Sequence, residues 1–216
     1  MSRWGQSVTR TSGEARRFWA AAPLETLYGM MEPEWAWRAW LRVAAGVISE
    51  PGTVFEPGCG IGLLADLLPE GCTYYDCDIN PGYVEAARRA RARPGATFDV
   101  RDFDDVLTSG EAFDWIVVTS LFGMFPETTA YELIPRFWGA ARRGFSLTTV
   151  DKGAFSGHRL LPFEFTSHDP DRLLEAATGL PGVDRAELHR GREFPEFRRD
   201  HRRHGLALFA WRKPGG

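Results

Sequence analysis

The order of apolar runs between residues 53 and 150 is the feature of this sequence that most constrains its fold. Short runs rich in β-branched and aromatic residues alternate with segments in which apolar residues recur at helical spacing. Strands that alternate with helices in this way pair in parallel, and the helices then cover both faces of the sheet. We expect strands at 53–56, 73–77, 97–100, 113–119 and 145–150, with helices at 63–68, 81–93 and 128–142.

The segments on either side of this region complete the predicted architecture. Helical spacing at 10–22 and 32–49 indicates two helices before the sheet. After the region come a helical segment at 169–178 and two β-rich runs at 185–189 and 206–212. No convincing helix separates those two runs, so a hairpin would make one strand antiparallel.

We therefore predict an α/β, doubly wound fold with a mostly parallel seven-stranded sheet, one antiparallel strand and helices on both faces. Residues 1–50 are expected to form an N-terminal helical extension or lid, and residues 51–216 the globular domain. The "ARRG" sequence at 141–144 is interpreted as a helix end, with basic residues in the last turn and glycine at the cap.

The stretch "VFEPGCGIGLL" at 54–64 places three glycines directly after the first expected strand, where open α/β sheets bind their ligands. A glycine turn of this kind serves NAD, ATP or the methionine part of S-adenosylmethionine. The NAD pattern needs a third glycine where this chain has Leu63, and the ATP loop needs a GK[ST] sequence that is absent. The chain has lysine only at 152 and 213.

The spacing E-x-G-x-G-x-G resembles the first motif of the class I S-adenosylmethionine-dependent methyltransferases. The resemblance continues through "YYDCDINPGYVEAARRA" at 74–90, "FDVRDFDDV" at 98–106 and "FDWIVVTSLFGMFP" at 113–126, which are similar to the second, third and fourth strands of that family with the segments that follow them. Four motifs in order cover roughly residues 53–150. The resemblance implies a methyltransferase that uses S-adenosylmethionine as cofactor.

The same resemblance implies a set of cofactor-binding residues. Asp78, twenty residues after Gly58, matches the carboxylate that accepts hydrogen bonds from both ribose hydroxyls, and Asp102 matches the acid near the adenine amino group. Capping a turn or helix is the alternative for either aspartate. The full expected set is Glu56, Gly58, Gly60, Gly62, Asp78, Ile79, Asp102, Phe103 and Ser120.

Residues for the acceptor and for catalysis are less sharply indicated. We expect Arg17, Trp19, Tyr28 and Phe122 to contact the substrate, with helix packing or core packing as the alternative for the aromatic residues. Methyl transfer needs orientation and exclusion of water more than it needs a base, so no catalytic residue is assigned. The acid/base candidates are His158, Glu164, His168 and Tyr28, each of which could instead be a surface or capping residue.

Composition limits the classes of function. A net charge of -3 gives no general attraction to nucleic acid or to an anionic membrane, and three cysteines without zinc-site spacing indicate neither a disulfide framework nor a metal site. Because no export signal or membrane span is visible in the sequence, we expect a cytoplasmic protein. The sequence does not decide whether the chain forms a homodimer. The "TSLFGM" sequence at 119–124 replaces the [DN]-P-P-[YF] motif of methyltransferases that modify amines of nucleic acids.

Three functions are compatible with the sequence, and we give them in order of preference. The first is methyl transfer from S-adenosylmethionine to an oxygen, nitrogen or carbon atom of a small molecule. The second uses the same cofactor for aminocarboxypropyl transfer or cyclisation, with release of methylthioadenosine. The third is a non-catalytic nucleic-acid-binding module that acts through the arginine-rich segment at 189–205.

Overall fold

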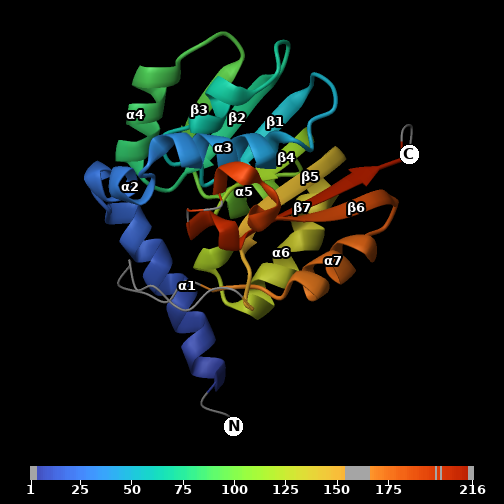
Figure 1. Ribbon diagram of the computed structural model, residues 1–216. Helices are drawn as coiled ribbons and strands as arrows, with labels where there is room; N and C mark the ends of the chain where they lie inside the picture. The colour runs from blue at the N-terminus through green and yellow to red at the C-terminus, as the bar shows by residue number, and fades with distance from the viewer. Residues whose placement is uncertain (1–3, 154–165, 198, 200, 214–216) are drawn as a thin grey trace.

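A computed structural model describes residues 4–153, 166–197, 199 and 201–213 of the 216-residue chain. Within these ranges seven strands form one sheet in the order β3-β2-β1-β4-β5-β7-β6 (Figure 1). The neighbouring pairs from β3 to β5 are parallel, whereas β7 is antiparallel to both β5 and β6. The predicted mostly parallel sheet with one antiparallel strand is confirmed. The strands are β1 (Thr53–Pro57), β2 (Thr73–Asp78), β3 (Ala96–Val100), β4 (Phe113–Val118), β5 (Ala141–Val150), β6 (Val183–Arg190) and β7 (Gly205–Arg212).

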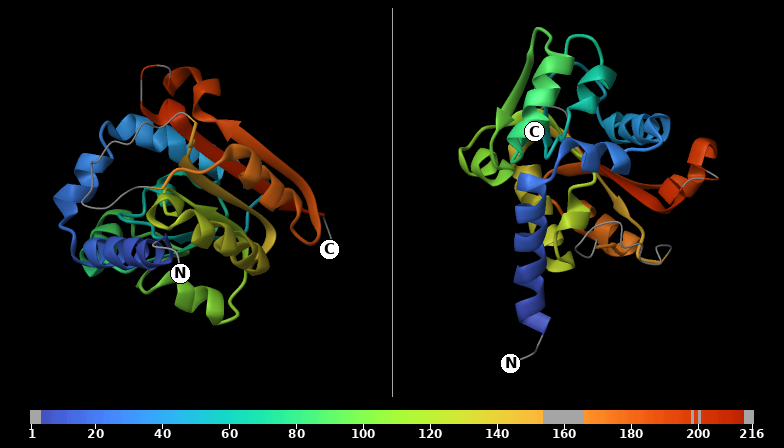
Figure 2. Two further views of the ribbon diagram at one scale, coloured as in Figure 1. Left: turned by 90° about the horizontal axis from the view of Figure 1, so that it is seen from below. Right: turned by 90° about the vertical axis from the view of Figure 1, so that its left-hand side faces the viewer.

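Helices cover both faces of this sheet (Figures 1 and 2). The longer helices are α1 (Trp4–Ala21), α2 (Leu24–Met30), α3 (Glu34–Ala45), α4 (Pro81–Arg91), α5 (Phe103–Thr108), α6 (Glu127–Ala140) and α7 (Pro170–Thr178). The short helices are η1 (Leu63–Leu67), η2 (Phe122–Met124), η3 (Gly191–Glu193), η4 (Pro195–Phe197) and η5 (His201–His204). Each of these helices in the described part of the chain lacks the length or the apolar character that crossing a membrane requires.

Two apolar cores lie on opposite faces of the sheet. Side chains alternate in direction along a strand, so Trp115 of β4 packs with α3 and α4 while its neighbour Ile116 packs with α5, α6 and α7. The central strands are buried on both faces, which explains their nearly continuous apolar sequence. This rigid layered body holds the ends of β1, β2 and β4 in fixed positions.

The N-terminal region contains three helices in the described residues rather than the predicted two. Pro23 and Pro33 precede α2 and α3, each at the N-cap position. Both prolines have an extended backbone, which suits an N-cap residue, and the N–H that proline lacks would have no partner within the helix. The N-terminal half of α1 projects away from the sheet, whereas its C-terminal half lies against the body (Figure 2).

The interpretation of residues 141–144 as a helix end is wrong. Helix α6 ends at Ala140 and the chain passes directly into β5. Gly144 is required there by the sheet, because a Cβ atom would lie 2.7 Å from the carbonyl oxygen of Ala210 on β7. The segment expected as a regular helix at 63–68 is the short 3-10 helix η1.

Candidate functional site

The glycine turn after β1 has the backbone conformation that its sequence indicates. Gly58, Gly60 and Gly62 all have positive φ values, of 68°, 56° and 67°. Residues with a side chain rarely adopt this conformation, so the alternating glycines let the chain turn tightly at the carboxyl end of β1. Gly58 and Gly60 line a cavity, whereas a Cβ atom at Gly62 would lie 2.8 Å from the ring of Phe98. The third glycine, Gly62, is therefore needed for close packing against Phe98.

The cavity beside this turn has a volume of about 440 Å³. The carboxyl ends of β1, β2 and β4 form its floor, and α1, α2 and α3 contribute its opposite wall. This is the edge at which open α/β sheets bind nucleotide-like ligands, and the volume is in the range of small-molecule sites. Eight of the nine residues expected to bind the cofactor line it: Glu56, Gly58, Gly60, Asp78, Ile79, Asp102, Phe103 and Ser120.

Asp78 occupies the last position of β2 and is 9% exposed. Its Oδ2 atom accepts a hydrogen bond from the backbone N–H of Gly60 at 3.0 Å, and its Oδ1 atom accepts one from the N–H of Asn80 at 2.8 Å. Burial raises the pKa of Asp78 to about 6. Each carboxylate oxygen has a second lone pair, so both can also accept from a ligand diol in the cavity.

Glu56 lies at the cavity floor and is 2% exposed. Its Oε1 atom accepts a hydrogen bond from the Thr119 hydroxyl at 2.6 Å, and its Oε2 atom accepts one from the Tyr74 hydroxyl. Burial raises the pKa of Glu56 to about 7, and the neighbouring Asp78 carboxylate adds to the shift. A cationic group in the cavity would favour the ionised form of this carboxyl.

Asp102 fits both of the roles that the sequence left open. As N-cap of α5 its Oδ1 atom accepts from the N–H of Asp104 at 2.9 Å, while the side chain also lines the cavity. Its Oδ2 atom forms an ion pair with Arg16 of α1. The expected cavity arginine, Arg17, is exposed and does not line the cavity. Arg16 and Trp19 lie three residues apart on one helix face, a spacing that would have identified Arg16.

Ser120 follows β4 in a conformation that side chains disfavour, with φ at 55°. Its N–H donates to the Thr148 hydroxyl at 2.9 Å, which ties the strained residue to β5. Strain of this kind is retained where the surroundings impose it, often at ligand sites. Ser120 is the one described residue other than glycine with a positive φ value, and it lines the cavity.

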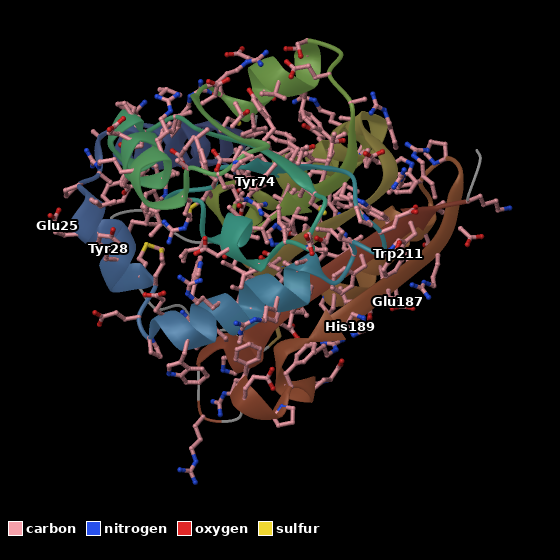
Figure 3. All side chains as sticks on the ribbon, turned by 90° about the horizontal axis from the view of Figure 1, so that it is seen from above. Glu25, Tyr28, Tyr74, Glu187, His189 and Trp211 are labelled. Carbon is pink, nitrogen blue, oxygen red and sulfur yellow. The ribbon has the colours of Figure 1, made fainter. Side chains whose placement is uncertain are left out.

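Several candidate residues lie outside this cavity or outside the described residues. Phe122 is fully buried, with its ring centroid 6.1 Å from that of Phe137, so it belongs to the core. His168 is also fully buried, and its Nδ1 atom is 2.7 Å from the Thr149 hydroxyl; burial lowers its pKa to about 4. Tyr28 is a 47% exposed residue of α2 (Figure 3). It lines a second hollow. His158 and Glu164 lie outside the described residues.

Trp19 lines the cavity, together with a larger set of apolar residues that the sequence did not single out. These additional lining residues come from α2, α3 and the segment after β4: Leu27, Met30, Met31, Trp37, Leu41, Leu121, Met124 and Phe125. Apolar periodicity does not distinguish a helix face that lines a cavity from one that packs on a core. Among the described residues, no group of three or more His, Cys, Asp or Glu side chains is placed to hold a metal ion.

Comparisons with known proteins agree with this geometry. Residues 54–144 match the family model described as a methyltransferase domain. No curated protein sequence matches the chain at a significant level.

Among solved structures, the magnesium protoporphyrin IX methyltransferase of Synechocystis PCC 6803 with bound SAM aligns with a TM-score of 0.63 and 17% identity, over 94% of this chain and 97% of that one. The plantazolicin methyltransferase BpumL in complex with SAH aligns with a TM-score of 0.67 and 10% identity, over 98% of this chain and 100% of that one.

Proposed function

We propose that this chain, whose residues 54–144 match the family model of a methyltransferase domain, uses S-adenosylmethionine to transfer a methyl group to a small molecule. One observation carries the proposal. The glycine turn, the Asp78 carboxylate and the buried Glu56 carboxyl meet in a single cavity at the carboxyl ends of β1 and β2. This donor set fits a ligand that has a vicinal diol and a cationic centre.

In this proposal, different residues of the cavity bind different parts of the cofactor. Asp78 accepts from the ribose hydroxyls, Asp102 and Phe103 hold the adenine, and the backbone of Gly58 and Gly60 approaches the methionine part. Glu56 complements the cationic side, with Ile79 and Ser120 completing the wall. The bound cofactor supplies an activated methyl group, so the protein needs to orient the acceptor and exclude water. A cytoplasmic location is part of the proposal.

A nucleic-acid-binding module is not favoured by the arginine-rich segment. Arg190, inside this segment, pairs with Asp151 at 2.7 Å. Arg185, just before the segment, pairs with Glu187 at 3.3 Å while its guanidinium stacks over Trp211. The cavity volume of about 440 Å³ likewise favours a small acceptor over a large one. Figure 3 shows Glu187, His189 and Trp211 at the opposite end of the molecule from Tyr28 on α2.

The test is titration calorimetry with S-adenosylhomocysteine on the unmutated protein and on Asp78→Asn. The variant keeps the shape of the side chain but loses the charge that the ribose hydroxyls would meet. Hydrogen bonds to charged groups are worth about 1.5 to 3 kcal/mol, so we expect affinity to fall roughly tenfold to a hundredfold. Asp105→Asn, an exposed residue of α5 near the site, is the matched control.

Unchanged affinity in Asp78→Asn would contradict the ribose assignment, and no binding to the unmutated protein would contradict the function. Mass spectrometry of the reaction products separates the chemistries that the cofactor allows. Release of S-adenosylhomocysteine supports methyl transfer. Release of methylthioadenosine instead would show that the aminocarboxypropyl group is transferred or cyclised.

A further inference from the structure

One half of the cavity is built almost entirely from apolar side chains. We call this part the apolar chamber and define it by Trp19, Leu27, Met30, Met31, Trp37 and Met124. It faces the glycine turn directly, because a Cβ atom placed on Gly60 would lie 2.9 Å from Leu27. We propose that the acceptor is an uncharged aromatic molecule held in this chamber. The inference rests on the proposed function, because the chamber lies beside the cofactor site.

The chamber concentrates the thioether side chains of the protein. The chain has four methionines, and three of them, Met30, Met31 and Met124, line this one cavity. Methionine is flexible and polarisable, and its sulfur makes favourable contacts with aromatic rings. A wall of this composition suits flat aromatic ligands and adapts to their outline.

Trp19 is held in place at the chamber by neighbours on two sides. Its indole N–H donates to the Met124 sulfur at 3.2 Å, and its ring centroid lies 5.1 Å from that of Phe18 in an edge-to-face arrangement. Met30 and Met124 pack with it around Ala15. A fixed indole offers an aromatic ligand a broad apolar surface at little cost in side-chain entropy.

The charges around the cavity argue against an ionised acceptor. Among the described residues that line it, the cationic side chains are Arg16 and Arg101; Arg16 pairs with Asp102, and Arg101 pairs with Glu111 at 2.8 Å. An anionic acceptor would therefore lose its water without gaining an uncommitted cation from the protein, which is costly. A cationic acceptor would also meet the positive centre of the cofactor in the same cavity.

The experiment uses two probes with one aromatic skeleton. N-phenyl-1-naphthylamine is uncharged, and 8-anilino-1-naphthalenesulfonate is the same molecule with an added sulfonate. Both are titrated by fluorescence into protein saturated with S-adenosylhomocysteine, so that neither probe can occupy the cofactor half. We expect one uncharged probe to bind per chain, at least about tenfold more tightly than the anionic one.

Met30→Glu and Tyr28→Glu locate the probe. Both variants add one carboxylate to α2, but Met30 lines the chamber whereas Tyr28 lies outside it. We expect Met30→Glu to weaken the uncharged probe about tenfold and Tyr28→Glu to leave it within about twofold. Calorimetry with S-adenosylhomocysteine confirms that each variant keeps its cofactor site.

Equal or tighter binding of the anionic probe would overturn the inference, and so would equal effects of the two substitutions. The ratio of the two probes is measured on the unmutated protein, so the test does not depend on how a variant folds. Failure of S-adenosylhomocysteine to bind is a different result, because it removes the proposed function itself.

Discussion

At the scale of single residues, Asp76 is unusual because its carboxyl group is fully buried. It lies in the middle of β2, is 0% exposed, and in the described structure neither of its carboxyl oxygens has a hydrogen-bond partner. It pairs across the strands with Glu56 of β1, and both carboxyls are buried. Burial raises the pKa of Asp76 to about 8, and the neighbouring Glu56 carboxylate adds to the shift. This shift favours the protonated form of Asp76 in the folded protein at neutral pH.

This raised pKa predicts how stability changes with pH. The unfolded chain releases the Asp76 proton near pH 4, whereas the folded protein holds it up to about pH 8. The contribution of Asp76 to the free energy of unfolding is therefore highest below pH 4. It falls as the pH rises from 4 to 8, by up to about 1.4 kcal/mol per pH unit, and is fully lost above pH 8. Urea denaturation should show a falling free energy of unfolding from pH 5 to pH 8, with a shallower slope in Asp76→Asn.

Glu56 and Asp78 have raised pKa values as well, so the variant keeps part of the slope. Asp99→Asn removes a carboxyl from the neighbouring strand β3, where the side chain is 45% exposed, and serves as the control. The same slope in Asp76→Asn as in the unmutated protein would mean that Asp76 is ionised in the folded state.

At the scale of secondary-structure elements, Asn80 joins the N-terminal helices to the cofactor side of the sheet. Its Oδ1 atom caps α4 by accepting from the N–H groups of Gly82 and Tyr83. Its Nδ2 atom donates to the carbonyl oxygens of Trp19 at 2.7 Å and Ala22 at 2.9 Å, at the end of α1. One side chain, two residues after Asp78, thus starts α4 and holds α1 over the cavity.

Asn80→Asp separates these two roles. Aspartate still caps α4, but it places an oxygen that cannot donate against the two carbonyls of α1. With two hydrogen bonds of about 1 kcal/mol each lost, we expect local opening of α1 to increase roughly thirtyfold. Amide hydrogen exchange, followed by mass spectrometry on peptides from α1 and α4, measures both effects in one experiment.

Asn80→Ala is the matched variant, because it removes the cap as well as the clamp. Faster exchange in α1 alone for Asn80→Asp, and in both helices for Asn80→Ala, is the expected pattern. If α1 exchanged at the same rate in both variants as in the unmutated protein, other contacts would hold the helix.

The elements differ in how well their sequence predicted them. The strands beside the cavity were predictable because β-rich runs are separated there by clear turn signals, as with the glycines after β1. The change from α6 to β5 was not predictable, because no turn residue separates Ala140 from Ala141. A glycine after basic residues is typical of a helix end, which is why the local sequence indicates one at Gly144. The contact that requires this glycine is made with Ala210, which lies far along the chain.

The residues that line the cavity were also only partly predictable from the sequence. Its floor follows from short motifs, since Glu56, Gly58, Gly60 and Asp78 lie at fixed offsets from strand ends. Its roof depends on how α1, α2 and α3 pack over that floor, which no local pattern specifies. This is why the sequence singled out Trp19 and Arg17 but not Arg16, although Trp19 and Arg16 are the ones that line the cavity.

At the scale of the whole molecule, Arg212 of β7 connects three parts of the chain. Its guanidinium donates to the carbonyl oxygens of Ala141 at 2.8 Å, Trp138 at 2.7 Å and Pro181 at 3.3 Å. It also stacks over the ring of Trp138, 4.1 Å from its centroid. These contacts join the end of α6, the start of β5 and the segment before β6.

Arg212→Met keeps most of the aliphatic stem and removes the three donors. Three hydrogen bonds from a charged group are lost, although the Pro181 carbonyl keeps the Trp138 indole N–H as a donor and the Trp138 carbonyl keeps the Ala141 N–H. We therefore expect a loss of about 2 to 3 kcal/mol in the free energy of unfolding by urea. Arg185→Met, in the same hairpin, removes a guanidinium that stacks over Trp211 and is 60% exposed, and should cost less than about 1 kcal/mol. Equal losses in the two variants would mean that the connecting role of Arg212 is not what stabilises the sheet.

The position of β7 between β5 and β6 also has a consequence for how the protein is made. A ribosome produces α1 and the cofactor-binding strands first, yet the sheet cannot close until residues 205–212 have emerged. Until then β5 lacks the strand it pairs with on that side, and β6 has no strand to pair with. Unpaired edges of this kind are prone to aggregation, so the nascent chain is most vulnerable after β5 has emerged and before β7 has done so.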